Sequence, residues 1–266
     1  MIEQMGALMD VDEALRRIKL IAPMLRQDVG TAVASHSVME ACNDVIPRGM
    51  NGIHTVYNDT YGIVQNALAL KLAMDIARIF DVGQNPKFPP ETQDKASVQV
   101  LGALFEIPGV KERLQAEASN WLPGIEDLRS DEEEQPSPEI AAIIEEIEAE
   151  HRAGDRETCS KTITAYLEIV ARLSEVGSHE EAAIKRVRDF RNRRLAHSLF
   201  DKEPDALPMY SDLNLLLALA MDAAKHASLI VEGLNTEFDE QADRDRSTAE
   251  GYAACVLQGL RWAESA

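Results

Sequence analysis

The segment "RDFRNRRLAHSLF", residues 188–200, combines clustered arginines with a histidine. From Lys185 to Arg194 there are six basic residues and one acid, Asp189, and His197 follows closely. Histidine titrates near neutral pH, and arginine is a planar, permanently charged cation that suits phosphate. The whole chain is acidic, with 46 Asp and Glu against 27 Lys and Arg and a formal net charge of −19. This basic segment is therefore the first candidate for a catalytic or anion-binding site.

RNA strand cleavage needs no metal ion when the 2′-hydroxyl group attacks the adjacent phosphate. The reaction needs a group that titrates near neutral pH and a fixed cation that stabilises the charge of the phosphorane. His197 would supply the first and an arginine the second. Arg193 and Arg194 lie four and three residues before His197, the spacings of neighbours on a helix. Arg191 lies six residues before His197, so these two would meet only through the reach of the arginine or across a subunit interface.

A helical wheel places two of these arginines on the apolar side of the predicted helix. That side is formed by Ile184, Val187, Phe190, Leu195 and Leu199. Arg191 falls near its centre, with Arg194 beside it. The side chains that point elsewhere, toward solvent, are those of Lys185, Arg186 and Arg193. An unpaired guanidinium is costly to bury, so either carboxylates of neighbouring helices pair with these arginines or the face is a groove that binds an anion. Position alone leaves both interpretations open.

The surrounding chain predicts helices throughout, because no strand-period alternation extends beyond a few residues. The predicted helical segments cover residues 11–45, 52–81, 96–106, 110–122, 139–176, 179–200, 210–235 and 248–263. The first should be disturbed at Pro23 and Gly30 and should stop before Pro47. Ser178 and Glu181 have capping-box spacing at the start of the arginine-rich helix. We expect an all-α fold, an antiparallel helical bundle.

The clearest interruption of the pattern is an acidic, Pro-rich linker or loop at residues 123–138, "PGIEDLRSDEEEQPSP". Residues 1–122 would form an N-terminal helical segment that packs with the bundle. Residues 139–235 would contain the arginine-rich helix and its neighbours, and residues 236–266 a C-terminal helix. The bundle is thus expected to carry additional helices at both ends.

The composition favours a globular protein of the cytoplasm. Hydrophobic residues make up 45% of the chain, enough to form a core. No stretch approaches the roughly 20 uninterrupted apolar residues of a membrane span, and the first residues lack the pattern of a signal peptide. The three cysteines are odd in number and widely spaced, which argues against a disulfide scaffold. We therefore expect a cytoplasmic protein with no membrane association.

Other motifs carry less weight. Glu148 and His151 have the E-x-x-H spacing of di-metal bundles, but a second E-x-x-H is missing from the sequence. Asp222 and His226 are an i,i+4 pair that we interpret as a structural contact, and His36 has no clustered partners. The sequence contains no glycine-rich phosphate loop, nucleophile elbow or dinucleotide fingerprint. We predict no metal site and no cofactor.

The segment "RNRRLAH", residues 191–197, resembles the R-x(4–6)-H motif of the HEPN superfamily, and the polar residue that usually follows the arginine is present as Asn192. "RNRRLAHSL" is similar to the motif helix of the abortive-infection AbiU-type branch. The earlier segment "YNDTYGIVQNALALKLAMDIARIFD", residues 57–81, also resembles that branch. The likeness extends over about residues 10–235.

The resemblance implies a HEPN-like bundle that pairs so that two motif helices face each other. It would make Arg191 the cation that stabilises the phosphorane, His197 the acid–base group and Asn192 the residue that orients them. The remaining arginines of the motif helix would contact RNA phosphates; these are Arg186, Arg188, Arg193 and Arg194. A two-fold homodimer would bring two histidines to one site, as base and acid.

Many HEPN proteins of this kind are metal-independent ribonucleases of defence or toxin–antitoxin systems. We therefore expect a homodimeric endoribonuclease of phage defence or of a toxin–antitoxin system, with RNA as substrate and an antitoxin or defence protein as partner. The alternatives are a catalytically silent HEPN scaffold or nucleotide-binding regulator, and a helical interaction module whose arginines only bridge helices. HEPN toxins silenced by nucleotide transfer usually carry a tyrosine two residues after the histidine. Leu199 occupies that position here, which argues against this form of control.

Overall fold

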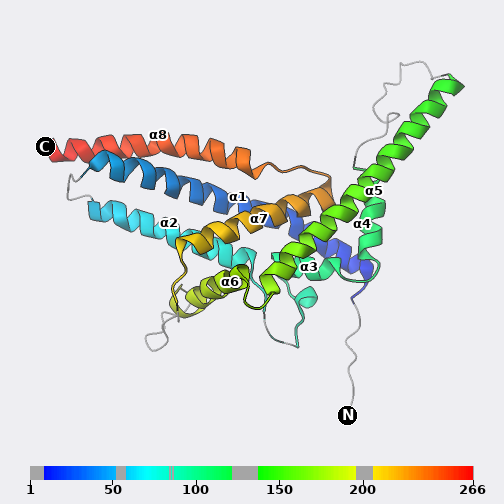
Figure 1. Cartoon of the computed structure of the whole chain (residues 1–266), viewed down its shortest axis with the longest axis horizontal. Coiled ribbons are helices and arrows are strands. Elements are labelled where there is room, and N and C mark those ends of the chain that lie inside the picture. Colours follow the sequence, from blue (N-terminus) through cyan, green and yellow to red (C-terminus); the bar gives the residue numbers. More distant parts are fainter. Residues whose placement is uncertain are drawn as a thin grey trace, which may run out of the picture. The chain divides into compact units, whose positions relative to one another are not determined.

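The computed structural model describes residues 9–51, 58–83, 85, 87–121, 137–195 and 206–265 of the 266-residue chain. These residues form eight α-helices and two short helical turns (Figure 1). Their bounds are α1 Val11–Met50, α2 Asn58–Ile79, η1 Pro90–Thr92, α3 Val98–Phe105, α4 Val110–Ala118, α5 Pro138–Ser174, α6 His179–Phe190, η3 Arg191–Leu195, α7 Tyr210–Glu232 and α8 Phe238–Ser265. No strand occurs in the described part of the chain, which confirms the all-α prediction.

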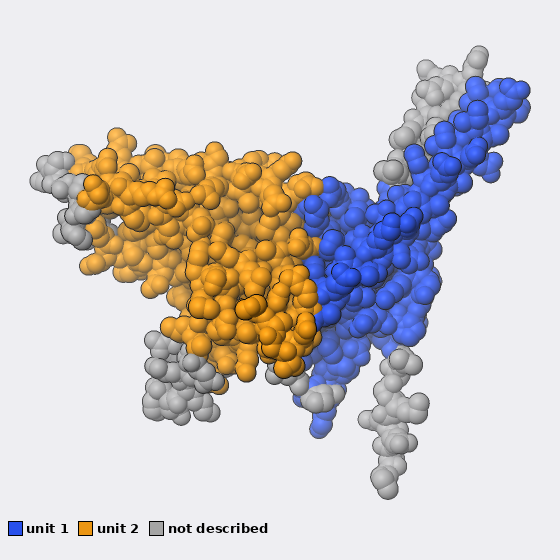
Figure 2. Space-filling model, viewed as in Figure 1, with its two compact units in different colours: residues 1–24, 82–171, 223–236 blue, residues 25–81, 172–222, 237–266 orange. Residues whose placement is uncertain are grey.

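The chain divides into two compact units, which Figure 2 colours separately. Unit 1 comprises residues 1–24, 82–171 and 223–236, and unit 2 comprises residues 25–81, 172–222 and 237–266. The predicted linker at residues 123–138 lies almost entirely outside the described residues, which resume at Ser137. The described residues of the arginine-rich helix belong to unit 2 alone.

α1 is one continuous helix of 40 residues, so the prediction that it stops before Pro47 is wrong. Proline lacks an amide hydrogen and costs a helix interior about 3 kcal/mol. The last turns of α1 are nevertheless held by an apolar cluster on one face, whose buried members from α1 and α8 are Cys42, Ile46, Met50, Ala253 and Leu260. Neither Pro23 nor Gly30 interrupts the helix. Burial along one face of α1 therefore outweighs the low helix propensity of Pro23, Gly30 and Pro47.

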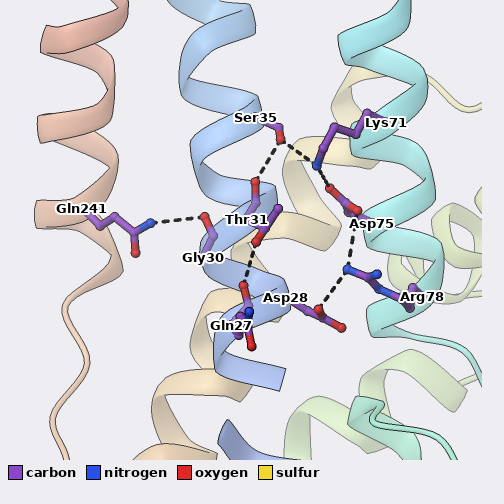
Figure 3. Close-up of polar contacts among 9 residues, drawn as sticks. All are labelled: Gln27, Asp28, Gly30, Thr31, Ser35, Lys71, Asp75, Arg78 and Gln241. Carbon is purple, nitrogen blue, oxygen red and sulfur yellow. Dashed lines mark hydrogen bonds and ion pairs between the residues drawn. The ribbon is translucent and has the colours of Figure 1, made fainter. Parts of the chain in front are cut away.

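In unit 2, a polar network joins α1 to α2 (Figure 3). Lys71 Nζ lies 2.5 Å from Asp75 Oδ2 and 3.1 Å from Ser35 Oγ. Arg78 Nη2 lies 2.9 Å from Asp28 Oδ1 and 3.6 Å from Asp75 Oδ1. Asp75 is only 9% exposed, and a carboxylate that is nearly buried is stable when cations compensate it. The network therefore aligns the C-terminal half of α2 along α1.

α8 lies along α1 on the side away from α2 (Figure 1). Gln241 Nε2 donates a hydrogen bond to the carbonyl oxygen of Gly30, 3.2 Å away. α8 begins at Phe238, earlier than the predicted helix over residues 248–263, because the buried Phe238 anchors its first turn. Helices α2 and α8 thus flank α1 within unit 2.

α7 is the one helix of the described residues that is long and apolar enough to cross a membrane by length and composition. The sequence predicts no such segment, because no stretch approaches the uninterrupted apolar length of a membrane span. Half of the apolar window is buried within the protein, and Leu216, Ala220 and Ala224 are each 0% exposed. A buried core helix meets the same criteria, so the composition of α7 is accounted for by packing.

Unit 1 packs α3 closely against α5. Tyr166 of α5 is fully buried and donates a hydrogen bond from its hydroxyl group to the carbonyl oxygen of Val98, 3.0 Å away. The ring of Phe105 meets that of Tyr166 edge to face, with ring centroids 5.1 Å apart. A Cβ atom at Gly102 would lie 2.7 Å from Cγ2 of Val170, so only glycine permits this approach.

Gly102→Ala should destabilise unit 1 although alanine favours helices, because the added methyl group would overlap Val170. The expected loss is about 1–3 kcal/mol in the free energy of unfolding, measured by urea denaturation with circular dichroism. Gly154→Ala in α5 is the matched control, since a Cβ atom there meets no heavy atom within 4 Å. That control should be neutral or stabilising by up to about 1 kcal/mol. Equal stability of the two variants would contradict the close approach of α3 and α5.

Candidate active site

The arginine-rich helix begins where its sequence predicts. Ser178 is the N-cap of α6, and its hydroxyl oxygen accepts a hydrogen bond from the backbone N–H of Glu181 at 3.0 Å. The same hydroxyl group donates to the carbonyl oxygen of Arg172 at 2.9 Å. Gly177 takes a left-handed conformation, with φ of 86°, which ends the preceding turn. The predicted start of the helix near Ser178 is thereby confirmed.

The helix changes its winding at the first residue of the motif. α6 is α-helical to Phe190, and Arg191–Leu195 form a π-helical turn. We expected one α-helix to about Phe200; residues 196–205 lie outside the described residues. A π turn bonds residue i to i+5, so side chains beyond Arg191 no longer follow the α-helical wheel. Single π turns inside helices occur frequently at functional sites.

Arg191 is held by a carboxylate and an amide. Its Nη1 lies 3.1 Å from Oδ1 of Asp81, which follows the C-terminal end of α2. Its Nε donates a hydrogen bond to Oδ1 of Asn192 at 3.0 Å. The Arg191 side chain remains 22% exposed. The structure thus realises the first interpretation of the apolar-side arginines, pairing with a carboxylate of another element. The guanidinium group is still accessible to solvent and has further N–H donors that could bind a ligand.

Arg188 contacts the same end of α2. Its Nη2 donates a hydrogen bond to the carbonyl oxygen of Phe80 at 2.6 Å. The last carbonyl groups of a helix lack partners and carry partial negative charge, so a guanidinium there is stabilising. Burial lowers the pKa of Arg188, and the nearby Asp81 carboxylate opposes that shift. The side chain of Arg188 thus links α6 to the backbone at the end of α2.

Arg186 points to a buried carboxylate, so the prediction that it points toward solvent is wrong. Its Nε and Nη2 donate to Oδ2 and Oδ1 of Asp212 at 2.8 Å and 2.6 Å. Asp212, the third residue of α7, also accepts from the backbone N–H of Met209 at 2.8 Å. The hydrogen bonds from Arg186 lower the pKa of the Asp212 carboxyl, and burial opposes them. One carboxylate thereby caps α7 and ties it to α6.

The remaining predicted site residues are at least partly exposed, or their side chains lie outside the described residues. Asn192 is exposed, and Arg193 is half-buried, with its Nη2 4.0 Å from Oδ2 of Asp189. The backbone of Arg194 belongs to the π turn, but its side chain and all of His197 lie outside the described residues. The predicted juxtaposition of Arg191 and His197 is therefore not tested by the geometry.

A second polar cluster joins α1 to the start of α7. The sequence around His36 offers it no clustered partners, but in the structure its ring stacks on that of Tyr210 with centroids 6.1 Å apart. His36 Nε2 lies 2.9 Å from Oδ1 of Asn214, and the Tyr210 hydroxyl group donates to Glu40. Burial and the Glu40 carboxylate raise the pKa of Tyr210. These contacts join residues distant in sequence, which helical periodicity does not reveal.

Within the described ranges, no group of three or more His, Cys, Asp or Glu side chains is placed to hold a metal ion. Glu148, the first residue of the E-x-x-H pair, instead lies 2.7 Å from Arg152 Nη2. The groups that the described site offers are guanidinium and amide donors, which bind anions. The arrangement suits contact with a phosphate.

Asp212→Asn should destabilise unit 2 at neutral pH by about 2 kcal/mol, the scale of hydrogen bonds to a charged group. The folded protein holds the pKa of this carboxyl below its unfolded value of about 3.9. Its contribution is therefore complete above that pH and is lost as the pH falls through the lowered pKa. The difference in unfolding free energy between wild type and variant should shrink below about pH 4. Asp94→Asn, at a fully exposed side chain, is the control; a pH-independent difference for Asp212→Asn would contradict this account.

Comparison with known families identifies the chain. The model of the HEPN family described as AbiU2 matches residues 25–252, which include Asp81, α6, the π turn and α7. A search of curated proteins and a search of solved structures give no significant match. The family match covers most of the chain and confirms the resemblance carried by the motif. The chain belongs to the AbiU2 family of HEPN proteins.

Proposed function

We propose that this AbiU2 protein is a metal-independent endoribonuclease that acts in abortive infection or as the toxin of a toxin–antitoxin system. The family is one of abortive-infection HEPN domains, which supports a role in phage defence. The observation that carries the proposal is the setting of Arg191. It is oriented by Asp81 and Asn192, lies at the π turn and remains 22% exposed.

An oriented guanidinium is suited to the charge that develops in phosphodiester cleavage. Asp81 and Asn192 hold Nη1 and Nε, so the group keeps its position without a substrate. Fixed donors stabilise a transition state better than mobile ones, because they need no reorganisation during the reaction. We assign Arg191 to the non-bridging oxygens of the phosphorane and Asn192 to the orientation of Arg191.

In the proposed reaction the 2′-oxygen of a ribose attacks the adjacent phosphorus, and the bond from phosphorus to the 5′-oxygen of the next nucleotide breaks. His197 takes the proton of the 2′-hydroxyl group, and the partner subunit's His197 gives a proton to the leaving 5′-oxygen. The products carry a 2′,3′-cyclic phosphate and a 5′-hydroxyl group. Arg193 and Arg194 would hold flanking phosphates. Arg186 and Arg188 are engaged by Asp212 and the Phe80 carbonyl oxygen, so their role in RNA binding would be secondary.

The same engagement of arginines favours one alternative, a catalytically silent HEPN scaffold. Arg186, Arg188 and Arg191 each contact another element of unit 2, as residues that only bridge helices would. The two proposals differ in one respect that can be measured. A scaffold does not need His197, whereas the endoribonuclease does.

His197→Ala and Arg191→Ala should each abolish cleavage of total cellular RNA, because the first removes the proton-transfer group and the second the fixed cation. Wild-type activity should persist in chelator. His197→Ala should cost only about 1 kcal/mol of stability, so circular dichroism should show an intact fold. His151→Ala and Arg113→Ala, at exposed positions outside unit 2, are the matched controls and should cleave as wild type does. If the wild-type protein does not cleave RNA, or if wild type and His197→Ala cleave it equally, the endoribonuclease proposal is wrong and the scaffold is the remaining function.

The homodimer can be tested by mixing wild type with the inactive His197→Ala variant. The proposed reaction uses the histidines of both subunits at one site, so a mixed dimer of wild type and His197→Ala lacks either the base or the acid. A co-refolded equal mixture should then keep only about a quarter of the wild-type cleavage rate, whereas chains that act independently would keep about half. A rate that falls only in proportion to the fraction of variant chains, although native mass spectrometry shows mixed dimers, would rule out a shared site.

A further inference from the structure

The first half of α5 buries no side chain against the other described residues. None of the residues from 138 to 158 is buried, and Cys159 is the first buried residue of α5. Figure 2 shows this part of α5 extending away from the other described residues of unit 1. Most of the stability of a helix in a protein comes from packing an amphipathic face rather than from helix propensity. Within the described part of the chain, the stretch therefore has no packed apolar face; near its end, Arg156 Nη1 donates a hydrogen bond to Ser119 Oγ at 3.2 Å.

A stripe of isoleucine runs along this stretch of α5. Ile140, Ile143 and Ile147 are 53%, 57% and 41% exposed, and Ile144 is half-buried. Their spacing of three and four residues places them on one face over two turns. This is the spacing with which a helix packs against a second helix. We call these four residues the isoleucine stripe.

The isoleucine stripe is bordered by acids. Residues 138–150 contain five glutamates and neither lysine nor arginine; the glutamates are Glu139, Glu145, Glu146, Glu148 and Glu150. At 100° per residue, Glu139 and Glu150 lie on one border of the stripe, and Glu148, which pairs with Arg152, lies on the other. Charges at these borders select the partner of a helix, because opposite charges attract and like charges repel.

We infer that the isoleucine stripe is a docking surface for a partner protein that presents an amphipathic helix with lysine or arginine beside its apolar face. A second copy of α5 is disfavoured, since its glutamates would meet those of the first. The acidic segment at residues 123–138 of the same chain is disfavoured for the same reason. A basic helix would bury the isoleucines and compensate the glutamates together. This inference does not depend on RNA cleavage.

The test uses the full chain and a synthetic helical peptide of about 20 residues, labelled with fluorescein. Leucine occupies its i, i+3, i+4 and i+7 positions, and lysine borders them; a second peptide has glutamate in place of lysine. Fluorescence anisotropy should show binding of the lysine peptide and not of the glutamate peptide. Ile143→Gln with Ile147→Gln should weaken binding at least about tenfold without changing the net charge.

Ala142→Gln with Ala149→Gln is the matched control, because both alanines are exposed on the opposite face of the same helix. This variant should bind as wild type does. Equal binding by the isoleucine variant would mean electrostatic adsorption and would overturn the inference, as would no binding of the lysine peptide. Self-association of the wild type that the isoleucine variant loses, measured by sedimentation without peptide, would make a second copy the occupant and would also overturn it.

Discussion

The site depends on the attachment of two arginines to the C-terminal end of α2. Arg188 donates to the carbonyl oxygen of Phe80, and Arg191 pairs with Asp81. A helix end offers unpartnered carbonyl groups with partial negative charge, and Asp81 adds a full charge beside them. Two adjacent turns of the motif helix, those of Arg188 and Arg191, are thereby attached to the end of α2. The position of Arg191 is consequently set by where α2 ends.

The end of α2 is in turn fixed by packing along α1. Lys71, Asp75 and Arg78 join α2 to α1, and the polar contacts continue to within one turn of Asp81 (Figure 3). Arg186 and Asp212 attach the same motif helix to the start of α7. In an acidic chain the basic segment thus serves two purposes. Arg186 and Arg188 hold α6 in place through their contacts with Asp212 and Phe80, and Arg191 remains partly exposed to solvent.

Much of this architecture follows from local sequence. The Ser178 cap and the position of α7 need only neighbouring residues, and these predictions are confirmed. The continuation of α1 through Pro47 could not be predicted, because it depends on burial against α8. The direction of Arg186 was missed for a similar reason: Asp212 lies on another helix. The wheel placed Arg191 on the packed side correctly, but it could not name Asp81 as its partner.

The π turn has a consequence for the spacing between the motif's arginine and histidine. A π-helical turn holds about one residue more than an α-helical turn of the same rotation. A related chain with one residue fewer between the arginine and the histidine could form an ordinary α-helical turn here. The residues that follow the turn would then start in nearly the same direction as in this protein. In this protein five residues separate Arg191 from His197, within the four to six of the superfamily motif. A change of winding at Arg191–Leu195 offers a structural means of absorbing such insertions and deletions while the arginine keeps its carboxylate.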